Sequence, residues 1–167
     1  KMPAILGGRV KTLEPNIFGA ILNRRDNKND QKEKKEHNIE DIDLVIVDLY
    51  PFEETKRGEA SEDEIIEKID IGGVALIRAA AKNFKDVVVI PSKDEYQNLI
   101  KIFKKTNETT LEERKRFAGK AFEVTSEYDL NIREFFQGLP LRYGENPHQK
   151  GEFIGNLEKS FVQLHGK

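Results

Sequence analysis

The chain has 167 residues, with 28 lysines and arginines against 30 aspartates and glutamates, and it contains no cysteine. This length predicts one domain with a sizeable core, and the near-neutral charge excludes the strong positive field that holds proteins on nucleic acid. Without cysteine there is no disulfide, no thiolate nucleophile and no cysteine-ligated metal. No apolar run approaches the roughly 20 residues of a membrane helix, and no secretory pattern is present, so we expect neither.

The first residues are arranged in an unusual way. Met2 stands second rather than first, and the chain enters a Gly-rich segment at Gly7 and Gly8 with no strand or helix before it. A natural domain rarely opens inside a segment of this kind. We therefore expect the chain to be a fragment that lacks its first strands.

Two apolar runs, residues 42–49 and 86–90, are rich in valine and isoleucine and nearly continuous rather than alternating. Such runs are typical of strands buried on both faces of a parallel sheet. Pro51 and Pro91 follow the two runs and end them, because proline cannot continue the ladder of hydrogen bonds. The sequence therefore predicts two parallel strands.

Helix starts are marked by matches to the capping box, in which two side chains satisfy free N–H groups of a first turn. The matches are Ser61 with Glu64, Ser92 with Glu95, and Thr110 with Glu113. A short Ala-rich helix is predicted over residues 74–83. Apolar residues at three- and four-residue spacing predict a long helix from Leu111 to about Phe136, ended by Gly138 and Pro140.

The order of these elements, strand, helix, helix, strand, helix and long helix, predicts an α/β protein with right-handed crossovers. Two strands are too few for a closed layer, so weaker strands either lie within residues 1–22 or are missing from the N-terminus. The polar run 27–36 indicates a solvated loop or the start of a surface helix. The tail after Leu141 is predicted to be loop-like.

Four short segments carry Gly, charged or aromatic residues beside predicted element ends, where open α/β sheets place their ligands. They are residues 7–12, 47–52, 69–73 and 78–83. The first segment offers N–H groups and cations to an anion, or is a plain basic turn. Tyr50 presents its phenol to a ligand or packs in the core. Asp70 belongs to a site or caps the next helix, and Lys82 is a site residue or a partner of the helix dipole.

Five motifs occur in a fixed order along the chain. They are Gly8-Arg9-Val10-Lys11-Thr12-Leu13, Leu49-Tyr50-Pro51-Phe52-Glu53-Glu54-Thr55, Ile69-Asp70-Ile71-Gly72-Gly73, Arg78-Ala79-Ala80-Ala81-Lys82-Asn83 and Arg142-Tyr143-Gly144-Glu145-Asn146-Pro147-His148-Gln149. In order and spacing the set resembles a family of bifunctional purine biosynthesis proteins that join IMP cyclohydrolase to AICAR formyltransferase. The resemblance implies a methylglyoxal-synthase-like α/β fold, a three-layer parallel sheet with flanking helices that lacks its first strands. It places this cyclohydrolase domain at residues 1–138 and the start of the formyltransferase domain at 139–167.

The resemblance also implies an activity, the dehydrative ring closure of FAICAR to IMP in the cytoplasm. Ring closure needs a donor for the developing oxyanion and a group that takes a proton from a weakly nucleophilic amide nitrogen. By resemblance, Lys82 is the proton donor or acceptor, with Asp70 beside it to hold its charge and orientation. The implied catalytic residues are Lys82, Lys11, Tyr50 and Asp70. The implied substrate-binding residues are Arg9, Val10, Lys11, Thr12, Val47, Asp48, Asp70 and Ile71, with Arg142 and Tyr143 matching positions that contact AICAR.

Three departures from the family alter the expected site. Asp48 stands where the family usually has asparagine, and a carboxylate only accepts hydrogen bonds whereas an amide also donates them. Glu14 and Phe18 stand where the family usually has histidine, which lowers the positive charge near Lys11. The phosphate-binding turns of the family's N-terminal part have no counterpart here, so we expect incomplete binding of the 5′-phosphate.

The expected ligand is a small nucleotide, FAICAR or IMP, with neither nucleic acid nor membrane as a partner. Ring closure is expected to need no metal and no organic cofactor. The formyltransferase half uses 10-formyltetrahydrofolate, but its Lys-His catalytic motif has no counterpart here. Family members dimerise, so we expect a homodimer of the complete protein. The alternative hypothesis is a non-catalytic, methylglyoxal-synthase-like nucleotide-binding or regulatory domain, which has no chemical need for the four catalytic residues.

Overall fold

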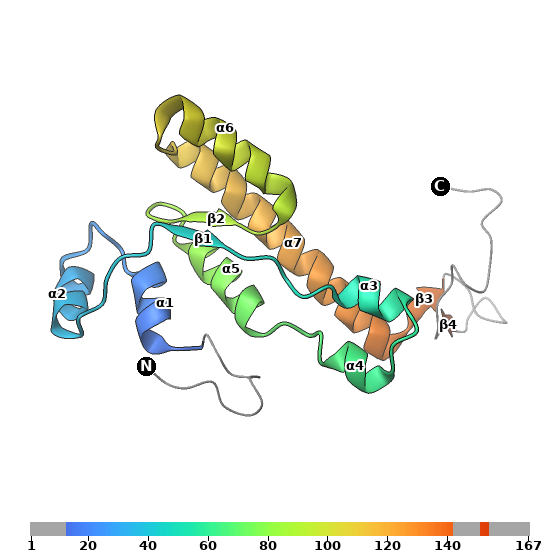
Figure 1. Cartoon of the computed structure of the whole chain (residues 1–167). Coiled ribbons are helices and arrows are strands. Elements are labelled where there is room, and N and C mark those ends of the chain that lie inside the picture. Colours follow the sequence, from blue (N-terminus) through green and yellow to red (C-terminus); the bar gives the residue numbers. More distant parts are fainter. Residues whose placement is uncertain (1–12, 142–150, 154–167) are drawn as a thin grey trace. The chain divides into compact units, whose positions relative to one another are not determined.

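The computed structural model describes residues 13–141 and 151–153, which form a mixed α/β protein (Figure 1). The elements in chain order are α1 (Pro15–Leu22), α2 (Lys28–Glu36), β1 (Leu44–Ile46), α3 (Phe52–Arg57), α4 (Glu62–Ile66), α5 (Gly72–Lys82), β2 (Val88–Ile90), the 3-10 helix η2 (Lys93–Glu95), α6 (Tyr96–Thr106), α7 (Leu111–Gln137), β3 (Leu139–Leu141) and β4 (Gly151–Phe153). They divide into two compact units. The first unit combines Lys1–Tyr50 with Asp70–Ser126, and the second combines Pro51–Ile69 with Glu127–Lys167. The domain limits expected from the sequence, 1–138 and 139–167, stay a prediction.

The first unit is built on a parallel pair of strands, β1 and β2, as the two valine- and isoleucine-rich runs predict. Leu44 pairs with Val88 and Ile46 with Ile90. β2 is buried along its whole length, whereas in β1 Val45 is buried and Ile46 is 47% exposed. The interpretation of both strands as buried on both faces is therefore correct for β2 and wrong for β1 in the part of the chain that the structure describes.

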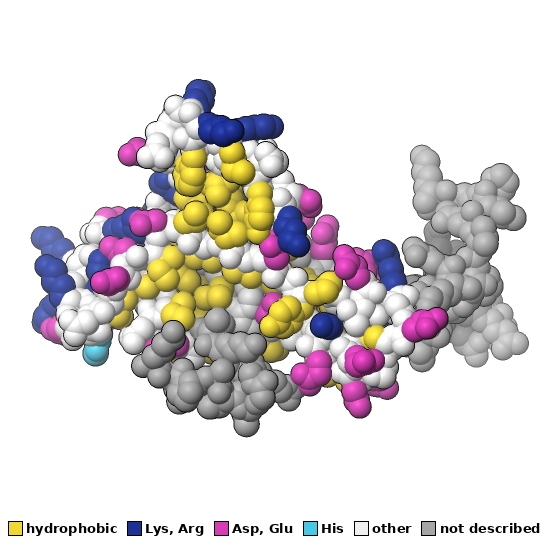
Figure 2. Space-filling view, in the orientation of Figure 1, with side chains coloured by type: hydrophobic (Ala, Val, Ile, Leu, Met, Phe, Trp, Pro, Cys, Tyr) yellow, Lys and Arg dark blue, Asp and Glu magenta, His cyan; other side chains and the backbone are white. Residues whose placement is uncertain are grey.

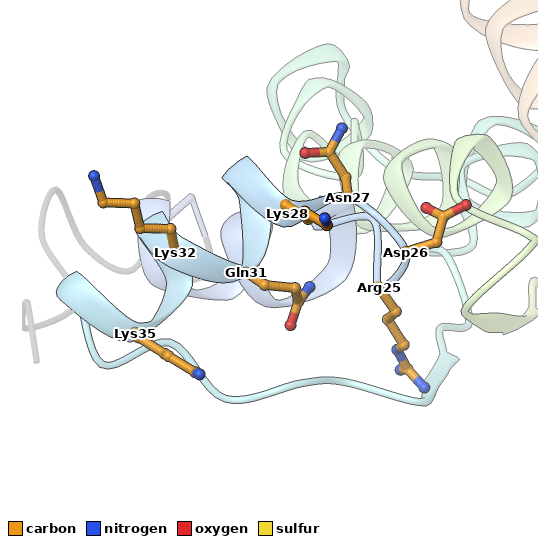
Figure 3. Close-up of a pocket in the computed structure, with 7 residues that line it drawn as sticks. All are labelled: Arg25, Asp26, Asn27, Lys28, Gln31, Lys32 and Lys35. Carbon is orange, nitrogen blue, oxygen red and sulfur yellow. The ribbon is translucent and has the colours of Figure 1, made fainter.

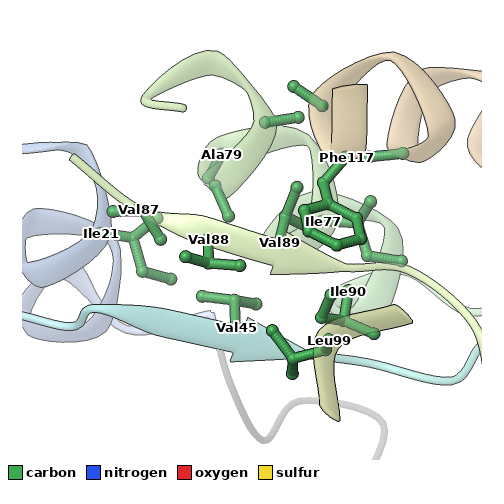
Figure 4. Close-up of a cluster of buried hydrophobic side chains, with 14 residues drawn as sticks. Ile21, Val45, Ile77, Ala79, Val87, Val88, Val89, Ile90, Leu99 and Phe117 are labelled. Carbon is green, nitrogen blue, oxygen red and sulfur yellow. The ribbon is translucent and has the colours of Figure 1, made fainter. Parts of the chain in front are cut away.

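The core of the first unit gathers buried side chains from both strands and from α1, α5, α6 and α7 (Figure 4). α5 lies along one side of the strand pair and α6 along the other (Figure 1). Ile77 of α5 and Phe117 of α7 are completely buried in this cluster. Burying an apolar side chain of this size stabilises the folded state by about 1.5–3 kcal/mol. The cluster therefore holds β2 and the middle of β1 in place.

The long helix and two of the helix starts confirm the sequence prediction. α7 runs from Leu111 to Gln137 and is followed by Gly138 with a φ of 75°, a left-handed conformation that glycine adopts without strain. Thr110 and Glu113 exchange bonds at its start, with Glu113 N donating to Thr110 Oγ1 at 3.2 Å and Thr110 N to Glu113 Oε2 at 2.8 Å. The other confirmed capping box is that of Ser61 and Glu64.

The third capping box, at Ser92 and Glu95, is wrong. The η2 turn and then α6 do follow Ser92, but the Ser92 side chain makes no cap bond. The Glu95 carboxylate accepts instead from Asn98 Nδ2 at 3.0 Å and from Arg116 Nη1 at 3.3 Å. Because α7 supplies Arg116, a tertiary contact replaces the local cap.

The N-terminal part of the first unit is helical. α1 occupies 15–22, so the expectation of a weak strand is wrong for these residues, and residues 1–12 lie outside the described part. Of the two alternatives predicted for the polar run, the surface helix is correct and the loop is wrong, because the run forms α2, which buries no side chain. Polar contacts hold it instead, because Arg24 Nε and Nη2 each donate to the Asp30 carboxylate, at 2.9 and 2.8 Å.

The second unit has its own small aromatic cluster. The buried Phe52 ring at the start of α3 meets Tyr128 and Phe135 of α7 edge to face, with centroids 6.1 and 5.8 Å apart. Tyr128 Oη donates to Lys68 O at 2.6 Å. β3 pairs antiparallel with β4, so the tail predicted to be loop-like after Leu141 contains a strand.

Apolar side chains also reach the surface of the first unit. Ile100 and Phe103 of α6 and Ile46 of β1 are each more than a third exposed. Figure 2 shows hydrophobic side chains gathered over α6 and the strand pair. None of the helices within residues 13–141 is both long and apolar enough to cross a membrane.

Candidate active site

Polar residues follow both strands at the point where the strands end. Because β1 and β2 are parallel and Ile46 pairs with Ile90, their carboxyl ends lie at one edge. Asp48 and Ser92 each come two residues after these paired ends. Ligands of open α/β sheets bind outside this edge, so we call the segments that follow the two strands the carboxyl edge.

Asp48 and Tyr96 are joined across the carboxyl edge. The Tyr96 hydroxyl donates a hydrogen bond to Asp48 Oδ2 at 2.6 Å, a length typical of a hydroxyl bound to a carboxylate. This bond, with a smaller contribution from burial, raises the pKa of Tyr96 above its ordinary value. The phenol is therefore held in its protonated, donating form.

Tyr50 lies two residues beyond Asp48 and is 49% exposed. This exposure contradicts the interpretation of Tyr50 as a core aromatic that fixes the turn. The neighbouring Phe52 is the buried aromatic of this segment, at 1% exposure. The phenol of Tyr50 is consequently accessible to a ligand.

Asp70 lies two residues before α5 and helps to begin it. Its Oδ1 accepts a hydrogen bond from Gly73 N at 2.7 Å. A Cβ at Gly73 would lie 2.5 Å from Asp70 Oδ2, so any larger residue there would displace this carboxylate. Asp70 thus accepts from the first turn of α5, as the capping interpretation expects, although the N-cap position is Ile71. The half-buried carboxylate lies at the N-terminus of α5.

Lys82 is the last residue of α5 and is exposed. An α-helix rises about 1.5 Å per residue, so the 11 residues of α5 separate Lys82 from Asp70 by about 16 Å. β2 begins shortly after α5 ends, which places Lys82 near the amino ends of the strands (Figure 1). The expectation that Asp70 lies beside Lys82 is wrong within one chain, and the C-terminal position suits a partner of the helix dipole.

The remaining predicted site residues divide between the carboxyl edge and the residues that are not described. Val47 N donates to Ile90 O at 3.0 Å and so continues the ladder beyond β1. Ile71 is 60% exposed at the start of α5. The predicted residues that lie outside the described part of the chain are Arg9, Val10, Lys11, Thr12, Arg142 and Tyr143.

Tyr96 and the hydroxyl of Ser92 are the features that sequence reasoning missed. Ser92 Oγ is buried and has no hydrogen-bond partner among the described residues. The signal for Tyr96 was available, because it follows the second strand at the same edge that Asp48 follows the first. Ser92 was interpreted only as a helix cap, which concealed its place at the edge.

A hollow of about 350 Å³ lies elsewhere in the first unit, beside α2 (Figure 3). The residues that line it are Arg25, Asp26, Asn27, Lys28, Gln31, Lys32 and Lys35. It contains none of the predicted site residues. Within residues 13–141 and 151–153, no group of three or more His, Asp or Glu side chains is arranged to hold a metal ion.

Comparison with known proteins identifies the family. The model of the AICARFT/IMPCHase bienzyme matches residues 80–167, more than half of the chain. The chain belongs to the AICARFT/IMPCHase bienzyme family. This confirms the resemblance carried by the five motifs, and with it the α/β class.

Members of this family are similar over nearly the whole chain. The bifunctional purine biosynthesis protein PurH of Bacteroides thetaiotaomicron is 52% identical over 99% of this chain, which covers 35% of that protein. PurH of Prochlorococcus marinus is 47% identical, again over 99% of this chain and 36% of that protein. The crystal structure of ForH is similar with a TM-score of 0.67 and 35% identity, covering 80% of this chain and 69% of that one. The chain thus spans about a third of the length of these PurH relatives.

Proposed function

We propose that this chain carries the nucleotide-binding edge of an IMP cyclohydrolase, which closes FAICAR to IMP with loss of water. The observation that carries the proposal is the position of Asp48 and Tyr50 just after β1, at the carboxyl end of a parallel strand pair, with Asp70 before the N-terminus of α5. The other half of the whole protein would formylate AICAR with 10-formyltetrahydrofolate. The cytoplasm is the compartment that such a pathway implies.

The residue types suit the chemistry of ring closure. The carboxamide nitrogen attacks the formamide carbon, so negative charge develops on the formyl oxygen and the nitrogen loses protons. The exposed phenol of Tyr50 can donate to that oxygen, and the Asp70 carboxylate can accept a proton or hold a cation. Lys11 and Lys82 would supply the cations.

We infer that Lys82 enters this site from a second copy of the chain. Within one chain, α5 holds Lys82 about 16 Å from Asp70, too far for a shared active site contact. Lys82 is exposed and therefore free to meet a neighbouring subunit. A symmetric dimer would then contain two equivalent sites, each completed by the lysine of the other copy.

The test uses the natural gene product that contains this chain and follows the absorbance of IMP formed from FAICAR. Lys82→Ala and Asp70→Asn should each lower kcat by at least about 100-fold, because each removes a proton-transfer or electrostatic group. Lys85→Ala is the matched control, since Lys85 is an exposed lysine close to Lys82 and outside the proposed site. It should leave kcat and KM unchanged.

Mixing the two inactive variants tests the shared site. If Lys82 and Asp70 act across two subunits, the mixed dimers contain one intact site, and up to about a quarter of the wild-type activity should return. Full activity of the Lys82→Ala variant would remove Lys82 from the mechanism. Tight IMP binding by a wild-type protein that does not turn over FAICAR would favour a regulatory nucleotide-binding domain instead.

A further inference from the structure

The hydrogen bond between Tyr96 and Asp48 links the segments that follow the two strands. Asp48 lies on the loop after β1, and Tyr96 is the first residue of α6 after β2. We propose that Tyr96 is a positioning residue that fixes Asp48 as an acceptor for an N–H group of the bound nucleotide base. This inference rests on the proposed function and names the contact that selects its substrate.

Asp48 needs such a partner to hold one orientation. Its side chain is exposed and lies outside regular secondary structure, where a carboxylate can adopt several rotamers. In the part of the chain that the structure describes, no ion pair involves Asp48, and its side chain accepts the 2.6 Å hydrogen bond from the Tyr96 hydroxyl. The orientation of the carboxylate therefore depends on Tyr96.

Tyr96 is well placed to supply that orientation. Its ring is partly buried and packs against the core cluster of the first unit. Its backbone begins α6, whose Leu99 belongs to the same cluster. A tyrosine anchored at its ring presents its hydroxyl from a fixed point, with only two side-chain torsions to settle. The position of the hydroxyl is thus set by the core rather than by the loop.

The hydrogen-bonding character of the pair selects the ligand. An ionised carboxylate can only accept hydrogen bonds, and the proton of the Tyr96 hydroxyl is already committed to Asp48 Oδ2. Asp48 Oδ1 and the lone pairs of the Tyr96 oxygen therefore remain as hydrogen-bond acceptors. A base that presents an N–H group, such as a carboxamide or a purine ring N–H, completes this arrangement. A base that presents only acceptors there would place an acceptor against Asp48 Oδ1, which costs affinity.

The experiment measures KM and kcat for ring closure of FAICAR in the natural gene product. Tyr96→Phe keeps the packed ring and removes the hydroxyl. It should raise KM about tenfold with kcat changed less than about twofold, because the contact aids binding equally in the ground and transition states. Asp48→Ala should raise KM at least as much. In the Asp48→Ala background, adding Tyr96→Phe should raise KM by less than about twofold more, because the Tyr96 hydroxyl acts through Asp48.

Tyr128→Phe is the matched control, because it removes a tyrosine hydroxyl that donates to Lys68 O in the second unit. Its KM should match the wild type. The inference is overturned if Tyr96→Phe leaves KM unchanged, or if its effect is as large in the Asp48→Ala background as in the wild type. An inactive wild type would instead contradict the proposed function. IMP binding measured by calorimetry would then test the inference: each single variant should lose about tenfold in affinity, and the double variant should lose little more.

Discussion

Asp70 and Lys82 lie at opposite ends of α5, and only Asp70 makes a hydrogen bond that begins the helix. Asp70 Oδ1 accepts the Gly73 N–H at 2.7 Å just before the helix, whereas Lys82 is its exposed last residue. A free N–H at a helix start needs an acceptor, but an exposed lysine at a helix end contributes little beyond a weak dipole interaction. Stability measurements can therefore separate the structural role of Asp70 from its proposed catalytic role.

We predict that Asp70→Ala lowers the free energy of unfolding by about 0.5–2 kcal/mol, the usual cost of losing a capping acceptor. Asp70→Asn keeps an acceptor oxygen and should cost less, and Lys82→Ala should change stability by less than about 0.5 kcal/mol. Urea denaturation followed by circular dichroism measures all three. Equal losses for Asp70→Ala and Asp70→Asn would show that the carboxylate charge, rather than the hydrogen bond to Gly73, stabilises α5.

Asn83 ties the C-terminus of α5 to the end of α1. Its Nδ2 donates to Ile21 O and to Asn23 O, each at 2.9 Å, and the side chain is buried. We predict that Asn83→Ala lowers the free energy of unfolding by about 1–3 kcal/mol, because a buried and a partly buried carbonyl lose their donor. Asn16→Ala, at an exposed position in α1, is the control and should cost under about 0.5 kcal/mol. A loss no larger than that of the control would mean that water replaces the Asn83 amide.

Ser92 offers the opposite case, a buried hydroxyl with no partner among the described residues. Removing an unsatisfied polar atom should be neutral or should stabilise the fold by up to about 1 kcal/mol, so we predict this for Ser92→Ala. The contrast is Thr110→Val, which removes a hydroxyl that accepts from Glu113 N and should cost about 0.5–2 kcal/mol. Thermal unfolding of both variants measures these changes in stability. A clear loss in Ser92→Ala would reveal a partner for Oγ.

The sequence predicts the parts of the fold that local signals control. Continuous β-branched runs ending at proline predict the two strands, and Thr110 marks the start of the long helix, since both depend on neighbouring residues. The capping box at Ser92 fails because Arg116, distant in the chain, takes the Glu95 carboxylate. Contacts between distant segments carry no local signal.

In the candidate site too, local sequence signals predict some features, and contacts between distant segments decide the others. Alignment of the two strands predicts that the residues after them share an edge, and the structure places Asp48 there. The bond from Tyr96 depends on where α6 begins, which the sequence leaves open. The separation of Asp70 from Lys82 could have been predicted, because the rise of a helix fixes the distance once both lie on its ends.

The ion pair of Arg24 and Asp30 helps to hold α2 in place, and its contribution to stability should depend on pH. Hydrogen bonds from the Arg24 guanidinium lower the pKa of Asp30 from 3.8 to about 2. Because the folded pKa is the lower one, the stabilisation is fully present above about pH 4 and is lost as the pH falls toward 2. Carboxyl carbon NMR of the wild type should therefore show Asp30 titrating near pH 2, and Arg24→Ala should move that midpoint up toward 3.8.

Asp41, whose pKa is lowered mainly by a hydrogen bond from Lys34, is the internal control and should titrate alike in both proteins. An Asp30 midpoint that stays near 2 without the guanidinium would show that the backbone N–H groups around α2, rather than Arg24, hold this carboxylate in its charged form.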